Sequence, residues 1–259
     1  AKLGQLYLQK GVWKGKRILS EVWVQEATSK QTSNGSDPDN DWDQGYGFQF
    51  WRCRNNCYRG DGAFGQFCIV IPEHEAVVAI TSGTNDMGGV MEAVWDILLP
   101  SMRPDPIKSD TANIRSLAIK LKDMSLPAVE GSPRSPVSEE LFQRTFKVSE
   151  NEAGVNSVSF ELHGDDHRIT VEMDHGKESL NLGAEKYIRS KMNHHLPFTQ
   201  GMRRQIGASG AWVKPDEYQA KIYLTETPAS ILYRFSFKNN RVTWTSQMRH
   251  SLFGPKNLT

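Results

Sequence analysis

The chain has few cysteines, no long hydrophobic run and almost no net charge, and each shortage excludes a class of protein. Three cysteines in 259 residues are too few for a disulfide-stabilised scaffold and fit a reducing compartment. No apolar run approaches the length of a membrane span. Thirty-one basic residues stand against thirty acidic ones, so the formal net charge of +1 gives no sign of binding to nucleic acid or to an anionic membrane. We expect a soluble globular protein.

The start of the sequence leaves its cellular location open. Ala1 is not an initiator methionine, and the first ten residues already follow a helical pattern. A targeting segment upstream of Ala1 would therefore be lost from view. Cysteine usage favours the cytoplasm, and export stays open as the alternative.

The pattern of the remaining residues predicts an α+β protein in three parts. Residues 1–102 read as short helices and short strands, and a change in composition with five prolines marks residues 103–136 as a linker that carries one helix, over residues 111–124. Residues 137–259 alternate polar and apolar side chains between turns, which predicts a β-rich domain, either a small barrel or a sandwich.

Within residues 1–102 the order of elements can be predicted more closely. Ser20 and Asp86 are suited to cap helices that follow them, and the second of these helices should stop before Pro100. Residues 31–44 are rich in Ser, Asn, Asp and Gly and predict an exposed loop. The expected strands are residues 46–52, 65–71 and 76–81, which together suggest an antiparallel meander.

A glycine-rich run over residues 58–72 is the most informative segment. Gly60, Gly62 and Gly65 lead directly into an apolar strand. Glycines without a Cβ atom let a peptide N–H approach a substrate closely, as an oxyanion hole requires. A β-bulge or a hairpin at a sheet edge explains the same spacing, so both interpretations remain open at this point.

Several segments taken together resemble the serine β-lactamase-like superfamily, in particular its branch of class C β-lactamases and penicillin-binding-protein-like esterases. They are AKLGQLYL at residues 1–8, GKRILS at 15–20, GYGFQFW at 45–51, and the glycine run followed by IVIP and AVVAITSG. The resemblance implies that residues 1–102 are the C-terminal part of a hydrolase domain. It also implies, more weakly, that residues after about 105 are a β-rich C-terminal extension.

The sequence departs from this family at its catalytic elements. It has no Ser-x-x-Lys and no Tyr-x-Asn or Tyr-x-Ser, so the nucleophile and its base are missing. Asp61, Gly62 and Ala63 stand where the family has Lys or His, a small residue and Gly. By the same resemblance the Phe64 N–H would be an oxyanion donor. A carboxylate at Asp61 cannot attract a carboxylate-bearing β-lactam, so an ester, an amide or another uncharged acyl substrate is favoured.

Three further side chains are candidate substrate contacts. The resemblance places Asn85 near substrate, although a helix cap explains it equally, and Trp51 and Tyr46 would line the cleft unless they are simply core. The function that follows is a C-terminal fragment of a serine hydrolase, inactive alone, that acts on a small acyl substrate together with a missing N-terminal half. The alternative is a binding or lid module formed by residues 137–259, with an apolar ligand inside a barrel.

Other motifs lead to no metal, cofactor or nucleic-acid site. The segment HGDDH at residues 163–167 predicts a turn between strands, and the side chains of His194 and His195 should diverge. The basic stretch over residues 186–204 predicts a solvated face. Cys53 and Cys57 flank a polar turn, where a hairpin would bring the sulfurs across from each other, as free thiols or as a disulfide.

Overall fold

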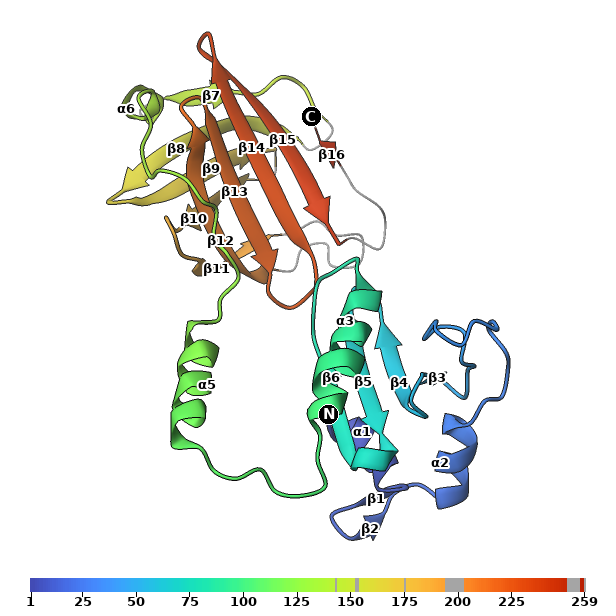
Figure 1. Cartoon of the computed structure of the whole chain (residues 1–259). Coiled ribbons are helices and arrows are strands. Elements are labelled where there is room, and N and C mark those ends of the chain that lie inside the picture. The colour runs from blue at the N-terminus through green and yellow to red at the C-terminus, as the bar shows by residue number, and fades with distance from the viewer. Residues whose placement is uncertain (143, 152–153, 175, 194–202, 251–256, 259) are drawn as a thin grey trace. The chain divides into compact units, whose positions relative to one another are not determined.

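The chain is an α+β protein whose computed structural model divides into two compact units (Figure 1). The structure describes residues 1–142, 144–151, 154–174, 176–193, 203–250 and 257–258. Unit 1 is Ala1–Ala118 and unit 2 is Ile119–Thr259. Helix α5 (Thr111–Asp123) spans the point of division. No helix in the described part of the chain is both long and apolar enough to cross a membrane.

Unit 1 is built around a four-stranded antiparallel sheet in the order β3-β4-β5-β6. Its elements are α1 (Lys2–Leu8), β1 (Val12–Trp13), β2 (Lys16–Arg17), α2 (Glu21–Thr28), β3 (Trp51–Arg52), β4 (Tyr58–Gly62), β5 (Gln66–Ile71), the 3-10 turn η1 (Pro72–His74), β6 (Ala76–Ile80), α3 (Met87–Ala93), the π-helical turn η2 (Val94–Leu98) and α4 (Leu99–Ser101).

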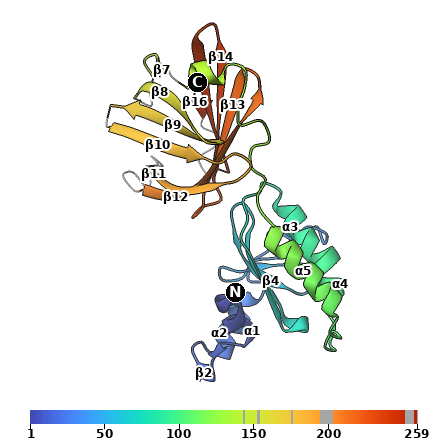
Figure 2. The ribbon, with the colours of Figure 1, turned by 90° about the vertical axis from the view of Figure 1, so that its left-hand side faces the viewer.

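Both faces of this sheet are covered, because β5 is apolar on both sides. Ile69 packs against Trp95 of η2 on one face, whereas Val70 packs against the α1 side on the other. Helix α1 approaches β5 closely at Gly4, where an added Cβ atom would lie 2.7 Å from the Cys68 sulfur. The sheet is therefore the middle of three layers (Figures 1 and 2).

The predicted helix starts are confirmed. Ser20 Oγ accepts a hydrogen bond from the Trp23 N–H at 3.1 Å, and Asp86 accepts one from the Gly89 N–H at 2.9 Å. The predicted end before Pro100 is wrong. Pro100 is the second residue of α4, and the chain enters α4 directly from the π-helical turn η2, so the helical segment runs through Pro100 to Ser101.

The expected strand over residues 46–52 is largely wrong. Only Trp51–Arg52 forms a strand, while Tyr46 makes isolated bridges to Thr32 and Trp51. Gln49 has a φ of 66°, a left-handed conformation that turns the chain back and interrupts the strand. The other two predicted strands of this sheet are confirmed as β5 and β6.

Unit 2 is a meander of antiparallel strands in two sheets, β10-β9-β8-β7 and β11-β12-β13-β14-β15-β16. Its elements are α6 (Ser138–Leu141), β7 (Thr145–Lys147), β8 (Val155–His163), β9 (Asp166–Met173), β10 (Gly176–Leu182), β11 (Ile188–Asn193), β12 (Arg203–Lys214), β13 (Glu217–Leu224), β14 (Ser230–Lys238), β15 (Arg241–Arg249) and β16 (Asn257–Leu258). Between the described strands no pairing closes the sheets into a barrel, so of the two predicted architectures the open one is found.

Aromatic side chains fill the interior between the two sheets of unit 2. Phe160 of β8 contacts Phe235 of β14 edge to face at a centroid distance of 5.0 Å, and Tyr218 and Phe146 also pack against it. Phe160, Tyr218 and Phe235 are each at most 3% exposed. An apolar ligand inside this domain is the alternative function expected from the sequence. Binding of such a ligand stays a prediction.

His167 is a buried titratable group of this interior. Its ring is 3% exposed, its Nε2 lies 2.7 Å from the Pro133 carbonyl oxygen, and it contacts Tyr218 edge to face. Burial lowers the pKa of His167 below 6.5 because the charged ring loses its hydration, which outweighs the Pro133 carbonyl and the neighbouring Asp166 carboxylate.

Unit 2 should lose stability as the pH falls below about 6.5 because of His167. The unfolded chain then binds a proton that the folded chain resists, so the free energy of unfolding is greatest above that pH and declines below it. Urea unfolding at about pH 7.5 and about pH 5.5 should show a smaller difference in His167→Gln than in the unchanged protein. His163→Gln, at the exposed end of the same hairpin, is the control. An unchanged pH dependence in His167→Gln contradicts the assignment.

Candidate functional site

The glycine run folds as a tight hairpin between β4 and β5. Gly62 pairs with Gln66, which leaves Ala63, Phe64 and Gly65 as the turn. Phe64 and Gly65 have φ values of 65° and 82°, so both are left-handed. The glycine spacing is therefore that of a hairpin, which joins the two central strands of the sheet rather than lying at its edge, and Gly60 and Gly62 lie within a strand. The oxyanion role of the Phe64 N–H stays a prediction.

Residues after β6 fix the position of this turn. Ser82 Oγ donates to the Phe64 carbonyl oxygen, 2.8 Å away, and the Thr84 N–H donates to the same oxygen at 3.2 Å. A side chain at Gly65 would collide with Ser82, since an added Cβ atom would lie 2.2 Å from its Oγ. The Phe64 carbonyl is thus held by hydrogen bonds from the segment that leads into α3.

Asn85 lies next to the β4–β5 turn, because the preceding residue, Thr84, donates its N–H to the Phe64 carbonyl oxygen. It is exposed, and the helix cap is Asp86 rather than Asn85. The capping explanation for Asn85 is therefore removed. Its proposed contact with a substrate stays a prediction.

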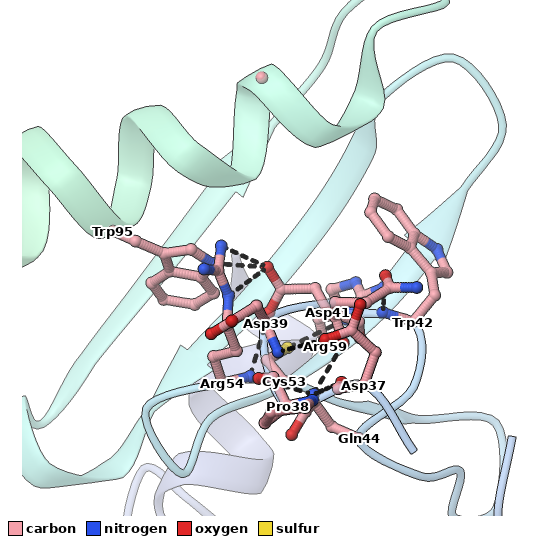
Figure 3. Close-up of polar contacts among 12 residues, drawn as sticks. Asp37, Pro38, Asp39, Asp41, Trp42, Gln44, Cys53, Arg54, Arg59 and Trp95 are labelled. Atoms are coloured by element: carbon pink, nitrogen blue, oxygen red, sulfur yellow. Dashed lines mark hydrogen bonds and ion pairs between the residues drawn. The ribbon is translucent and has the colours of Figure 1, made fainter. Parts of the chain in front are cut away.

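Arg59 is fully buried beside the turn, on the face of the sheet that α3 covers. Its Nε lies 3.0 Å and its Nη2 2.9 Å from Asp61 Oδ2. Its Nη1 donates to the carbonyl oxygens of Asp41 and Arg52 and to the Cys53 sulfur, at 3.1, 3.2 and 3.1 Å. The guanidinium also lies 4.8 Å from the Trp42 ring centroid. Figure 3 shows Arg59 beside Cys53, Asp41 and Trp42.

The Asp61 carboxylate is buried and bonded to Arg59 and Trp42. Its side chain is 7% exposed, and besides Arg59 it accepts a hydrogen bond from Trp42 Nε1 at 3.1 Å. Arg59 and Asp61 share a face of β4 because they alternate along the strand, opposite Ile69 and Phe67 of β5. The Asp61 carboxylate is thus paired with a guanidinium.

Asp41 links the preceding loop to the last helical segment. Its Oδ2 accepts hydrogen bonds from Trp95 Nε1 at 2.8 Å and from Arg54 Nε at 3.2 Å (Figure 3). The sequence predicts an exposed loop over residues 31–44, yet Asp41 is 4% exposed. The loop folds inward at this residue because three separate segments present donors to one carboxylate and its backbone.

Trp51 and Tyr46 lie against each other at the rim of the same cluster. Their rings meet edge to face at a centroid distance of 4.9 Å, and the Arg59 guanidinium lies 5.6 Å from the Trp51 centroid. Both side chains are half-buried. The structure therefore brings Trp51 and Asp61 together around Arg59, with Tyr46 against Trp51. The sequence interpretation did not select Arg59, and its spacing of two residues from Asp61 is the signal that could have found it.

Cys53 and Cys57 face each other across the β3–β4 hairpin. The Cys53 N–H donates to the Cys57 carbonyl oxygen at 3.0 Å, and both thiols are buried and free. The sulfurs have different partners, Arg59 for Cys53 and the Asn55 carbonyl for Cys57. Burial raises the pKa of Cys53 to about 11 and that of Cys57 to about 12.

The motifs set aside in the sequence also have places in the structure. His163 and Asp166 close a turn between β8 and β9, as predicted, whereas His194 and His195 lie outside the described residues. Part of the basic stretch is paired, since Lys186 lies 3.0 Å from Asp166. Within the described ranges, no group of three or more His, Cys, Asp or Glu side chains is placed to hold a metal ion.

Comparison with solved structures gives a distant similarity. No protein-family model and no curated protein match the sequence. A similar solved structure is that of the octameric penicillin-binding protein homologue from Pyrococcus abyssi, with 13% identity and a TM-score of 0.24 over 98% of this chain and 44% of that one. The chain thus spans less than half the length of that protein.

Replacing Arg59 should strongly destabilise unit 1. Arg59→Met leaves the buried Asp61 carboxylate without its cation, a loss of about 3 kcal/mol in the free energy of unfolding. Urea unfolding followed by tryptophan fluorescence measures this. Lys16→Met, which removes an exposed cation from β2, should change the free energy of unfolding by less than about 0.5 kcal/mol. Equal effects of the two variants would contradict the role given to Arg59.

The two buried thiols should be free and slow to react. At about pH 8, thiols with such raised pKa values carry almost no thiolate, so iodoacetamide should label Cys53 and Cys57 far more slowly in the folded protein than in denaturant. Thiol counting in denaturant, without reductant, should give all three cysteines. A count of one would show that Cys53 and Cys57 are joined.

Proposed function

We propose that the β4–β5 hairpin forms one wall of an acyl-hydrolase site of the serine β-lactamase-like kind. The observation that carries the proposal is the left-handed turn at Phe64, whose carbonyl oxygen is held by Ser82 and Thr84, within a segment whose sequence resembles that family's third catalytic element. In this proposal the Phe64 N–H donates to the oxyanion that develops when a carbonyl carbon is attacked.

The proposed substrate is a small uncharged acyl compound, an ester or an amide. Asp61 takes the position at which the family presents a cation, and its charge is balanced by Arg59 at 2.9 Å. An ion pair of this kind presents no unbalanced positive charge to a substrate carboxylate. Asn85 would contact the acyl group, and Trp51 and Tyr46 would line the cleft. The small residues Gly62 and Ala63 would let the substrate approach the protein backbone closely.

The nucleophile in this proposal comes from outside these 259 residues. No serine here has a lysine three positions later, and one oxyanion donor alone stabilises little. The partner would be a polypeptide with the Ser-x-x-Lys and Tyr-x-Asn or Tyr-x-Ser elements, either upstream in the same polypeptide or a separate chain. By itself, this chain should not turn over substrate.

Hydrolysis assays and active-site labelling test the proposal. The chain alone should hydrolyse neither p-nitrophenyl butyrate nor a chromogenic cephalosporin, and a fluorophosphonate should label none of its serines. Produced together with the sequence encoded immediately upstream, it should hydrolyse the ester, with the phosphonate on the upstream serine. A labelled serine within this chain would overturn the proposal. It would also be overturned if the upstream sequence lacks the Ser-x-x-Lys and Tyr-x-Asn or Tyr-x-Ser elements and the longer protein does not hydrolyse the ester.

An amide-to-ester replacement at Phe64 tests the oxyanion donor itself. This change replaces the N–H by oxygen and keeps the backbone shape, so kcat of the complete enzyme should fall about 10²-fold to 10³-fold. The control is Phe64→Gly, which keeps the N–H and tolerates the left-handed turn and so should stay within about threefold of the unchanged kcat. If the ester-substituted enzyme has an unchanged kcat, Phe64 is not the donor.

A further inference from the structure

Unit 2 carries a groove of about 360 Å³ on the outer face of its larger sheet. One side of the groove is a strap, residues 127–132, that crosses strand β12. The Val129 N–H donates to Ser209 Oγ at 3.0 Å, the Tyr187 hydroxyl donates to the Pro127 carbonyl oxygen at 2.8 Å, and Ser132 pairs with Trp212 through two backbone hydrogen bonds of 2.9 Å. The groove is therefore held in shape by the fold of unit 2 alone.

Strand alternation decides which side chains reach this groove. On β13 the even-numbered Tyr218, Ala220 and Ile222 are buried in the interior, so Gln219 and Lys221 point outward. Arg234 of β14 is the cross-strand partner of Gln219 and shares its face, as does Leu232 opposite Lys221. Leu232 and Val213 give the groove an apolar part.

The charges of the lining are unbalanced. Lys221, Arg234 and Arg249 line the groove, and Glu130 is the one carboxylate among its lining residues. In the described part of the chain no ion pair joins any of these three cations to a carboxylate. Other cations on the same sheet are paired, such as Lys214 with Glu217 at 2.7 Å.

Glu217 does not neutralise the groove. The hydrogen bond from Lys214 lowers the pKa of Glu217 most, and the positive charge of Arg234 lowers it less. The Glu217 carboxylate is therefore paired chiefly with Lys214. Gln219 also donates to Glu217, at 2.8 Å. Among the described residues no hydrogen bond or ion pair engages the Arg234 guanidinium, so its donors are available to a ligand.

We propose that this groove binds a small organic anion. One or two carboxylates would be held by Lys221, Arg234 and Arg249, and a short apolar part would lie on Val213 and Leu232. The volume falls in the range of small-molecule sites, and the apolar part favours an organic carboxylate over inorganic phosphate. The inference is independent of the hydrolase proposal, because every lining residue belongs to unit 2.

Calorimetric titration of the full chain with glutarate tests the site, with inorganic phosphate and neutral glutaramide as separate arms. Glutarate should bind saturably with one-to-one stoichiometry and more weakly as salt is added. Phosphate should bind more weakly than glutarate, and glutaramide should not bind. No saturable binding of glutarate up to about 10 mM would overturn the proposal, and phosphate binding as tightly as glutarate would overturn its organic part.

Matched variants separate a built site from general attraction. Arg234→Gln and Arg249→Gln should each weaken glutarate binding at least about tenfold, whereas Arg234→Lys should retain most of it. Arg241→Gln removes the same charge from a different groove, which Arg241 lines with Lys238, and should leave binding unchanged. If Arg241→Gln weakens binding as much as Arg234→Gln, the attraction is non-specific and the proposal fails. Circular dichroism confirms that each variant is folded.

Discussion

Unit 1 depends on a single buried guanidinium. Arg59 has no access to solvent, so its guanidinium relies on acceptors within the protein. It finds them in four segments: Asp61 on its own strand, the Asp41 carbonyl in the loop, the Arg52 carbonyl on β3 and the Cys53 sulfur in the β3–β4 turn. Arg59 thereby ties the loop at Asp41, the rings of Trp42 and Trp51, and the Asp61 carboxylate to one another.

The same interaction sets the electrostatic character of the proposed catalytic wall. In the proposed site a Lys or His would offer a charge to the substrate, whereas the Asp61 carboxylate is paired with the buried Arg59 guanidinium. In the proposed site the hairpin would then contact the substrate through its shape and through the Phe64 N–H, and not through a charged side chain. This arrangement fits recognition of an uncharged acyl group better than recognition of an acid.

Local signals predicted part of the fold, and long-range burial explains the rest. Ser20 and Asp86 could be read as caps because a cap acts on residues only three positions away. Strand β12 could not be recognised, because the interior covers one of its faces and the strap covers the other. Its central residues are buried on both sides, which leaves no alternation of polar and apolar side chains. In the candidate site, the glycines predict the hairpin. The Arg59 cluster depends on the inward fold of the loop over residues 31–44, and no short sequence pattern predicts that fold.

The strap of unit 2 has a consequence for the order of folding. Strands β7 to β15 pair with neighbours in sequence, so they can form hairpin by hairpin, whereas the bond from Val129 to Ser209 joins residues 80 positions apart. We therefore expect the strap to dock late, onto strands that have already paired. A ligand lying between the strap and the sheet would hold this last contact closed, so its concentration would appear as added resistance of the strap to proteolysis.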